Sequence, residues 1–338
     1  MRPLYVFIAI VVTATLFAQP KTFTLQGEND SWFGDSDDGY TNGTRLLWSW
    51  EPKEASPLGK LAAIVCRHEL TDTCRRTVTA GLGQTMYTPR NLGTPLRTVG
   101  DRPYGGWLFG TLMFDATRAT TNDHVELYAG VIGPHSYAAE AQTFIHQEVT
   151  PAATDPEGWD HQIGEFAGVL ATYERRQQLL SRRSGDVEWF DLSSALGGAA
   201  GNVFVNGNAT ATARLGYNLP ERFISPIQEA APLALDGSAP QPKPKPNKNW
   251  DAYVYAAANA AYVARNIFLD AEDEAYRIER EPNVREHRMG VSVRIRKVRL
   301  AYQHTWRSSE FSTFIGGRTR AARDSSYDMV LLSFGPEP

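Results

Sequence analysis

Apolar and polar residues alternate along most of the chain beyond about residue 20, with the period of two that separates the faces of a β-strand. The first such segment is Thr22–Glu28 and the last is Tyr327–Phe334. Ten segments between them follow the same pattern: Gly43–Trp50, Thr77–Met86, Tyr104–Phe114, His124–Ile132, Glu165–Tyr173, Val187–Leu196, Asn202–Tyr217, Trp250–Val263, Met289–Arg296 and Val298–Arg307. The pattern predicts an all-β protein of about twelve strands.

The polar faces of many of these segments carry small or uncharged residues (Gly, Ala, Ser, Thr, Asn and Gln) rather than charged ones. An apolar face opposite such a face is typical of a membrane barrel, which has lipid outside and a polar lumen inside. Aromatic residues gather near the segment ends, like the girdles of such barrels: Trp48, Trp50, Tyr104, Trp107, Trp189, Phe190, Tyr253, Tyr255 and Trp306. A soluble β-sandwich with an aromatic core is the alternative.

The last segment favours the barrel. Asp328, Val330, Leu332 and Phe334 share one face, and the segment ends on an aromatic residue close to the end of the sequence. Closing strands of outer-membrane barrels commonly have this form. We therefore predict an antiparallel transmembrane β-barrel of about twelve strands.

The N-terminal segment has the features of a secretory signal peptide. Arg2 supplies positive charge, Leu4–Ala18 is almost wholly apolar, and the expected cleavage site follows Ala18. The apolar run is shorter than the about 20 residues of a transmembrane helix. We expect residues 1–18 to be the signal peptide and residues 19–338 to form a single barrel domain in the bacterial outer membrane.

An even number of strands puts both termini and alternate connections on the periplasmic side. One of these connections, residues 219–249, is rich in proline and is expected to be an extended loop. Another contains Cys66 and Cys74, which can form a local disulfide in an exported protein. The remaining connections are the predicted outer loops: Asp30–Asn42, Tyr87–Pro103, Gly133–Gly164, Gly197–Gly201, Asn266–Arg288 and Ser308–Ser326.

The first outer loop is acidic. Asp30, Asp35, Asp37 and Asp38 precede the polar run Tyr40–Gly43. Carboxylate, amide and hydroxyl oxygens at this density suit a hard cation such as calcium. A solvated acidic loop without a metal is the alternative.

The third outer loop contains the strongest helix-forming stretch of the mature chain, Ala138–Gln147. Within it, Gln142 and His146 are four residues apart and share one helical face. A histidine beside a hydrogen-bonding partner can serve as a general base near neutral pH. A surface histidine without a catalytic role is the alternative, and His124, His135, His161 and His304 are competing candidates.

The second outer loop is a candidate anion site. Arg102 lies in the turn-rich run Gly100–Trp107 beside a predicted aromatic girdle, and Arg90 and Arg97 lie in the same loop. These arginines can bind a lipid phosphate, or Arg102 can simply mark the start of a strand. The formal net charge of −4 gives no reason to expect nucleic acid as a partner.

Five groups of residues, in this order along nearly the whole mature chain, resemble the outer-membrane lipid A 3′-O-deacylase family. They are Glu28-Asn29-Asp30 with Tyr40-Thr41-Asn42-Gly43, Gly100–Trp107, Gly133-Pro134 with Gln142 and His146, Gly158-Trp159 with Gln162, and Arg307–Phe311. The resemblance implies a twelve-stranded barrel with a calcium-dependent esterase site at its outer rim, between the wall and a helix of an outer loop.

By this resemblance, His146 is the general base, and Gln142, Asn29 and Thr41 are its partners in the site. Asp30 is the expected calcium ligand, together with Asn29. The family often has a glutamate six residues after the histidine, where this chain has Ala152, so Asp155 or Glu157 is the expected replacement. The family's basic residue of the second outer loop has Arg90 or Arg97 as its counterpart.

The resulting hypothesis is a calcium-assisted esterase that removes a 3′-linked acyl chain from lipid A of lipopolysaccharide, with its site facing the outer leaflet. Calcium polarises the ester carbonyl, His146 deprotonates a water, and Arg102, Arg97 and Arg90 hold the lipid phosphate. The alternatives are a non-catalytic barrel, either a channel or a structural protein, and an outer-membrane phospholipase. Nothing in the sequence indicates an oligomer, so a monomer is expected.

Overall fold

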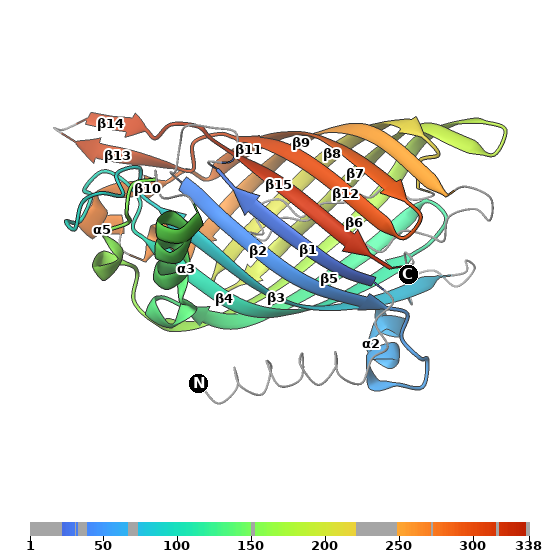
Figure 1. Cartoon of the computed structure of the whole chain (residues 1–338), viewed down its shortest axis with the longest axis horizontal. Helices are drawn as coiled ribbons and strands as arrows, with labels where there is room; N and C mark the ends of the chain where they lie inside the picture. Colours follow the sequence, from blue (N-terminus) through green and yellow to red (C-terminus); the bar gives the residue numbers. More distant parts are fainter. Residues whose placement is uncertain are drawn as a thin grey trace.

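In the computed structural model, twelve antiparallel strands close into a barrel (Figure 1). The structure describes residues 22–30, 32, 39–66, 74–149, 153–220, 249–271, 273–315 and 318–335. The barrel strands are β1 (Thr22–Asn29), β2 (Gly39–Trp50), β3 (Arg75–Thr88), β4 (Gly105–Thr117), β5 (Thr121–Ile132), β6 (Phe166–Ser184), β7 (Val187–Gly201), β8 (Phe204–Tyr217), β9 (Trp250–Asn266), β11 (Asn283–Ile295), β12 (Val298–Arg307) and β15 (Ser325–Phe334). The predicted fold class is confirmed. The expected signal peptide and most of the proline-rich connection lie outside the described residues.

Each barrel strand pairs with its neighbours in the chain, and β1 pairs with β15 to close the ring. The register of this closure joins Phe23 to Phe334 at one end and Asn29 to Asp328 at the other. We call the first end, where β1 begins and β15 finishes, the terminal end. The other is the α3 end, after the helix that it carries (Figure 1).

Short elements at the α3 end lie in three of the six predicted outer loops, whereas the predicted loop Gly197–Gly201 is the end of β7. They are η1 (Pro134–Ser136), α3 (Ala138–Phe144), η2 (Ile145–Val149), η3 (Trp159–His161), α4 (Ile267–Asp270), α5 (Asp273–Tyr276), β10 (Ile278–Arg280), β13 (Phe311–Ile315) and β14 (Arg318–Ala321). Strands β10, β13 and β14 form a separate small sheet that projects beyond the wall (Figure 1). The helix predicted over Ala138–Gln147 is confirmed as α3 and η2.

At the terminal end, helix α2 (Pro57–Cys66) packs on the outside of β3, β4 and β5. Cys66 is disulfide-bonded to Cys74, as the spacing allowed. Arg118 donates a hydrogen bond from Nη2 to the Cys66 carbonyl at 3.1 Å and thereby satisfies the helix C-terminus. Within the described part of the chain, no helix has the length and hydrophobicity needed to span a membrane.

The two faces of the wall differ as the alternation predicts. Apolar side chains are exposed along the outer face, where lipid would cover them: Leu25, Leu46, Val169, Leu196, Val254, Val291 and Leu300. Tyr217 and Trp250 stack near the terminal end with their ring centroids 4.4 Å apart, in the manner of an aromatic girdle.

The lumen is filled by buried ion pairs. Arg45 pairs with Glu126, and Arg214 pairs with Asp191, with all four side chains fully buried. Nearer the α3 end, the Arg307 guanidinium donates from Nε to Glu286 at 2.5 Å. The Arg45–Glu126 pair joins β2 to β5, which are not neighbours, whereas the other two pairs join adjacent strands. All three link strands of the wall and occupy lumenal space that a pore would need.

The ion pair between Arg45 and Glu126 makes a testable prediction about stability. Arg45→Ala leaves the buried Glu126 carboxylate with the more distant His124 Nε2, 3.6 Å away, in place of its guanidinium partner, which should lower the free energy of unfolding by about 3–5 kcal/mol. The measurement is denaturant unfolding of the refolded barrel in detergent. Arg76→Ala is the control, because the Arg76 partner Glu54 is 83 % exposed and such pairs contribute less than about 1 kcal/mol. Equal losses in the two variants would contradict the stabilising role of the lumenal pair.

Candidate active site

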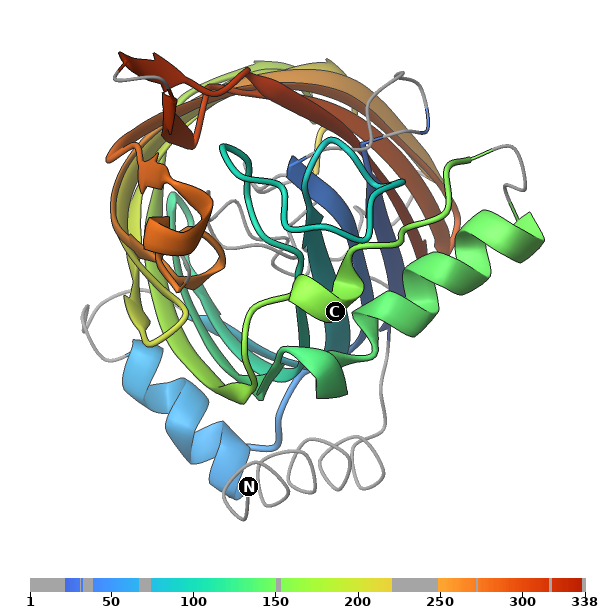
Figure 2. The same ribbon diagram turned by 90° about the vertical axis from the view of Figure 1, so that its left-hand side faces the viewer.

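Helix α3 lies across the outer face of the wall, not in the lumen. Figure 2 looks onto the α3 end and shows the helix outside the ring of strands. The buried side chains of α3 and η2 are Ala138, Gln142 and His146, which are spaced four residues apart and form one face. Ala138 packs with Met86 of β3, so this face is turned toward β3 and β4.

Gly106 of β4 permits the close approach of this segment. A Cβ atom at Gly106 would lie 2.2 Å from Ser136 Oγ and 2.4 Å from Ala138 Cβ. These distances leave no room for any side chain at that position. The glycine therefore sets how closely the helical segment can pack on the wall.

His146 lies in a π-helical turn, in which the helix widens after Phe144. Its Nδ1 atom is 2.6 Å from the carbonyl oxygen of Thr154. A carbonyl can only accept, so Nδ1 carries the proton and the neutral ring keeps its proton-accepting lone pair on Nε2. This arrangement fixes both the tautomer and the orientation of a histidine that is 7 % exposed.

Gln142 is oriented by Trp159. The indole Nε1 of Trp159 donates to Gln142 Oε1 at 2.9 Å, and the Trp159 ring packs on Tyr104 with centroids 4.8 Å apart. Because indole is only a donor, the bond distinguishes the amide oxygen of Gln142 from its nitrogen. Gln142 Nε2 is buried and makes no hydrogen bond to the described residues, so it is a donor available to a ligand.

The wall side of the site is built on an irregularity in β2. Pairing with β3 shifts between Tyr40 and Asn42, which makes Thr41 an extra residue in a β-bulge. Thr41 Oγ1 lies 2.6 Å from Thr88 Oγ1. Since Thr88 is two residues beyond Met86 on β3, it shares the face that packs against α3.

Asn29 and Asp30 join Thr41 at this rim. The Asp30 backbone N–H donates to the Thr41 carbonyl at 3.3 Å, and Asn29 pairs in register with Asn42. Asp30 and Thr41 are each 2 % exposed. The predicted partner Asn29 and the predicted calcium ligand Asp30 therefore lie next to Thr41 of β2, and β2 neighbours β3, on which α3 packs.

The three predicted arginines of the second outer loop do not form one cluster. Arg102 is buried, with its guanidinium 4.9 Å from the Tyr87 ring centroid and its Nη1 3.3 Å from Glu310 Oε2. Arg90 is exposed nearby, whereas Arg97 lies 5.2 Å from the ring centroid of Tyr276.

Comparison with known proteins assigns the family. The family model described as outer membrane protein LpxR matches residues 4–318. The chain belongs to this family. The structure is similar to LpxR from Salmonella typhimurium, with a TM-score of 0.73, 19 % identity, and coverage of 93 % of this chain and 99 % of that one.

A second solved structure, the β-domain of the Bordetella autotransporter BrkA, has a TM-score of only 0.39 at 8 % identity, covering 93 % of this chain and 98 % of that one. No curated protein matches the chain significantly. The LpxR family match confirms the resemblance drawn from the sequence motifs and identifies an outer membrane protein.

For this LpxR family member, the metal ligands stay a prediction. The oxygen atoms of Asn29 and Asp30 are the hard donors that calcium prefers. Among the described residues there is no group of three or more His, Cys, Asp and Glu side chains that could hold a metal ion. Ala152 and the acidic positions Asp35, Asp37 and Asp38 lie outside the described residues.

The two carboxylates expected to replace the family's glutamate lie on exposed positions of the segment that leads to Trp159. Asp155 directly follows Thr154, whose carbonyl holds His146. The Glu157 backbone N–H donates to the Leu92 carbonyl at 2.9 Å, which fixes this segment to the second outer loop. Asp155 is therefore the carboxylate closer in the chain to the histidine contact.

The sequence analysis named His304 as a competing histidine but missed its acidic partner. His304 Nδ1 lies 2.8 Å from Asp328 Oδ1, which also accepts a hydrogen bond from the Tyr302 hydroxyl at 2.5 Å. Tyr327, the next residue to Asp328, packs on lumenal Tyr40, so alternation puts Asp328 on the outer face. The register of β12 against β15, which pairs His304 with Asp328, was the signal that a single sequence does not reveal.

Gly106→Ala tests the packing of α3 on the wall. The added methyl group should cost about 1–3 kcal/mol of overpacking, which corresponds to roughly 5- to 150-fold faster hydrogen–deuterium exchange in Ala138–Phe144. Gly164→Ala is the control, because nothing lies within 4 Å of a Cβ there. Unchanged exchange in the Gly106 variant would show that the helix does not depend on this contact.

Proposed function

We propose that this LpxR family barrel is an esterase that removes a 3′-linked acyl chain from lipid A in the outer leaflet of the outer membrane. The observation that carries the proposal is the place of His146. It lies on a helix outside the barrel wall, with its base nitrogen defined by the Thr154 carbonyl. A site on the outer face of the wall is within reach of a lipid in the membrane.

In the proposed reaction, His146 Nε2 accepts a proton from a water molecule as its oxygen attacks the ester carbonyl carbon. The tetrahedral intermediate then collapses, and the bond between the carbonyl carbon and the sugar oxygen breaks. His146 returns the proton to that oxygen, which leaves as a hydroxyl group, and the acyl chain leaves as a fatty acid. No serine nucleophile takes part.

Gln142 and the rim residues orient the reacting groups. Gln142 Nε2 is the buried donor available for the oxyanion, since Trp159 occupies the amide oxygen. Asn29 and Asp30 would hold a calcium ion, which when bound supplies positive charge that polarises the ester carbonyl. Thr41, tied to Thr88, keeps the rim of β2 in register with them.

The filled lumen argues against the channel alternative. Arg45, Glu126, Arg176 and Glu174 are each at most 2 % exposed, so water does not reach the lumenal charges of the described strands. A conducting pore would keep such side chains hydrated. We expect no stable ion conductance when the protein is inserted into planar lipid bilayers, and steady conductance would favour the channel.

His146→Ala should lower the deacylation rate about 10²- to 10⁴-fold, because the general base is lost. The measurement is mass spectrometry of lipid A after incubation of purified protein with lipopolysaccharide. His135→Ala is the matched control in the same loop, since its side chain is 68 % exposed and pairs with Glu165. The control should keep full activity.

His304→Ala separates the two candidate bases. The proposal expects a smaller loss than in His146→Ala, because His304 of β12 contacts Asp328, which pairs in register with the rim residue Asn29, and is not the general base. If His304→Ala lowers the deacylation rate as much as is expected for His146→Ala, and His146→Ala itself stays active, the general base is His304. Loss of acyl chains from glycerophospholipids instead of lipid A would favour the phospholipase alternative.

Removal of calcium tests the metal. A chelator should abolish acyl release from lipopolysaccharide, and added calcium should restore it, because Asn29 and Asp30 supply ligands that favour this cation. Asp30→Asn should raise the calcium concentration needed for half-maximal activity. Full activity in the presence of the chelator would rule calcium out.

A further inference from the structure

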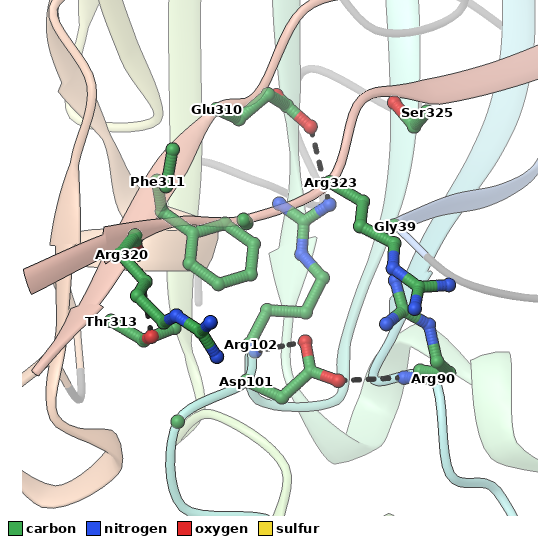
Figure 3. A pocket seen from close by; sticks show the side chains of 13 residues that line it. Gly39, Arg90, Asp101, Arg102, Glu310, Phe311, Thr313, Arg320, Arg323 and Ser325 are labelled. Atoms are coloured by element: carbon green, nitrogen blue, oxygen red, sulfur yellow. Dashed lines mark hydrogen bonds and ion pairs between the residues drawn. The ribbon is translucent and has the colours of Figure 1, made fainter. Parts of the chain in front are cut away.

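A cavity of about 270 Å³ opens at the α3 end between the second outer loop and the β13–β14 hairpin. Figure 3 shows its lining, to which arginines contribute from both segments. Arg90 and Arg102 come from the loop, and Arg320 and Arg323 come from the hairpin and the residues after it. We call this cavity the arginine pocket.

The acidic residues of the arginine pocket, Asp101 and Glu310, bond to the arginines of the pocket itself. Asp101 Oδ2 accepts from the Arg90 backbone N–H at 2.9 Å, and Oδ1 accepts from the Arg102 N–H at 2.8 Å. Glu310 pairs with the Arg102 guanidinium. The two carboxylates therefore balance only part of the charge of the four arginines, and burial raises the pKa of Asp101, which makes its ionised form less favourable.

Arg320 and Arg323 make the pocket suitable for an anion. Both are exposed, and neither takes part in an ion pair with another described residue. Arg102 lines the same pocket with 1 % exposure, and besides its pair with Glu310 its Nε and Nη2 atoms make no hydrogen bond to the described residues. Guanidinium groups converging from separate segments match an oxyanion with several acceptor oxygens, and phosphate is the common example.

The pocket adjoins the candidate active site. Gly39 lines the pocket and pairs with Thr88, the residue whose hydroxyl contacts Thr41. Gly39 and Thr41 are two residues apart on β2, or about 7 Å along the strand. An anion in the pocket would thus lie roughly one sugar ring from the rim residues.

We propose that the arginine pocket binds a phosphate group on the saccharide of the lipid substrate, with Arg320 and Arg323 as its direct ligands. This inference rests on the proposed action on a phosphorylated glycolipid. The phosphate is either on the disaccharide that carries the acyl chains or on the attached core saccharide. The pocket orients the sugar so that its ester reaches the site where α3 packs on β3.

The test measures binding instead of turnover, so that it can fail separately from the proposed deacylation. The His146→Ala protein in detergent is titrated with phosphorylated lipid A, with the same lipid after removal of its phosphates, and with lipopolysaccharide that retains its core. Arg320→Ala or Arg323→Ala should weaken binding of phosphorylated lipid A about 10- to 100-fold and leave binding of the dephosphorylated lipid unchanged.

Arg318→Ala is the matched control, because Arg318 is exposed on the same hairpin but does not line the pocket. Weakened binding of core-bearing lipopolysaccharide alone would also support the pocket and would locate the phosphate on the core. The proposal is overturned if the pocket variants bind every lipid as well as the parent protein does. It is equally overturned if Arg318→Ala weakens lipid binding as much, since the loss would then reflect the overall positive charge of the hairpin and not the pocket.

Discussion

Closure of the sheet between β1 and β15 is the constraint on which the rest of the structure depends. In hydrocarbon, every backbone N–H and C=O must find a partner within the protein, and a sheet achieves this only by closing. Seven residue pairs from Phe23–Phe334 to Asn29–Asp328 complete the ring. Because the closed wall must present apolar side chains to lipid, polar chemistry is confined to the lumen and to the rim.

The lumen uses its polar residues for stability. Ion pairs such as Arg45 of β2 with Glu126 of β5 bridge strands that are not neighbours and fill lumenal space, so a substrate could enter only by breaking buried charge pairs. The rim has the opposite character. There a β-bulge at Thr41, a π-turn at His146 and a glycine at Gly106 all depart from regular structure. Such departures cost stability and are commonly found at functional sites.

Most of the barrel could be predicted from the sequence because the period of two is encoded separately in every strand. The end of the barrel at which each loop lies then followed from counting strands. Gln142 and His146 could be placed on one face because residues four apart meet on a helix, and the π-turn does not change this. The sequence pattern predicted that this strand ends at Tyr173, whereas β6 continues to Ser184. The prediction stopped early because the last residues of β6 are mostly charged or polar and do not alternate with apolar residues.

Helix α2 was missed although a local signal existed. Ser56 Oγ accepts a hydrogen bond from the Gly59 N–H, and Pro57 occupies the first helical position, which together mark a helix start. The hairpin β13–β14 was missed for another reason. Its strands are only five and four residues long, too short for a period to be recognised. The arginine pocket depends on that hairpin, so no pattern in the sequence could reveal it.

The second outer loop joins the two parts of the candidate site. At Leu92 and Tyr104 it packs with Trp159, the residue that orients Gln142. At Arg90 and Asp101 it forms the wall of the arginine pocket. A ligand that binds at the pocket and orders this loop would also stabilise the packing around Trp159, since the pocket residues and the residues that contact Trp159 belong to one short segment. Binding of the saccharide and orientation of the catalytic amide are therefore expected to be coupled, with the coupling carried by the loop rather than by the rigid barrel.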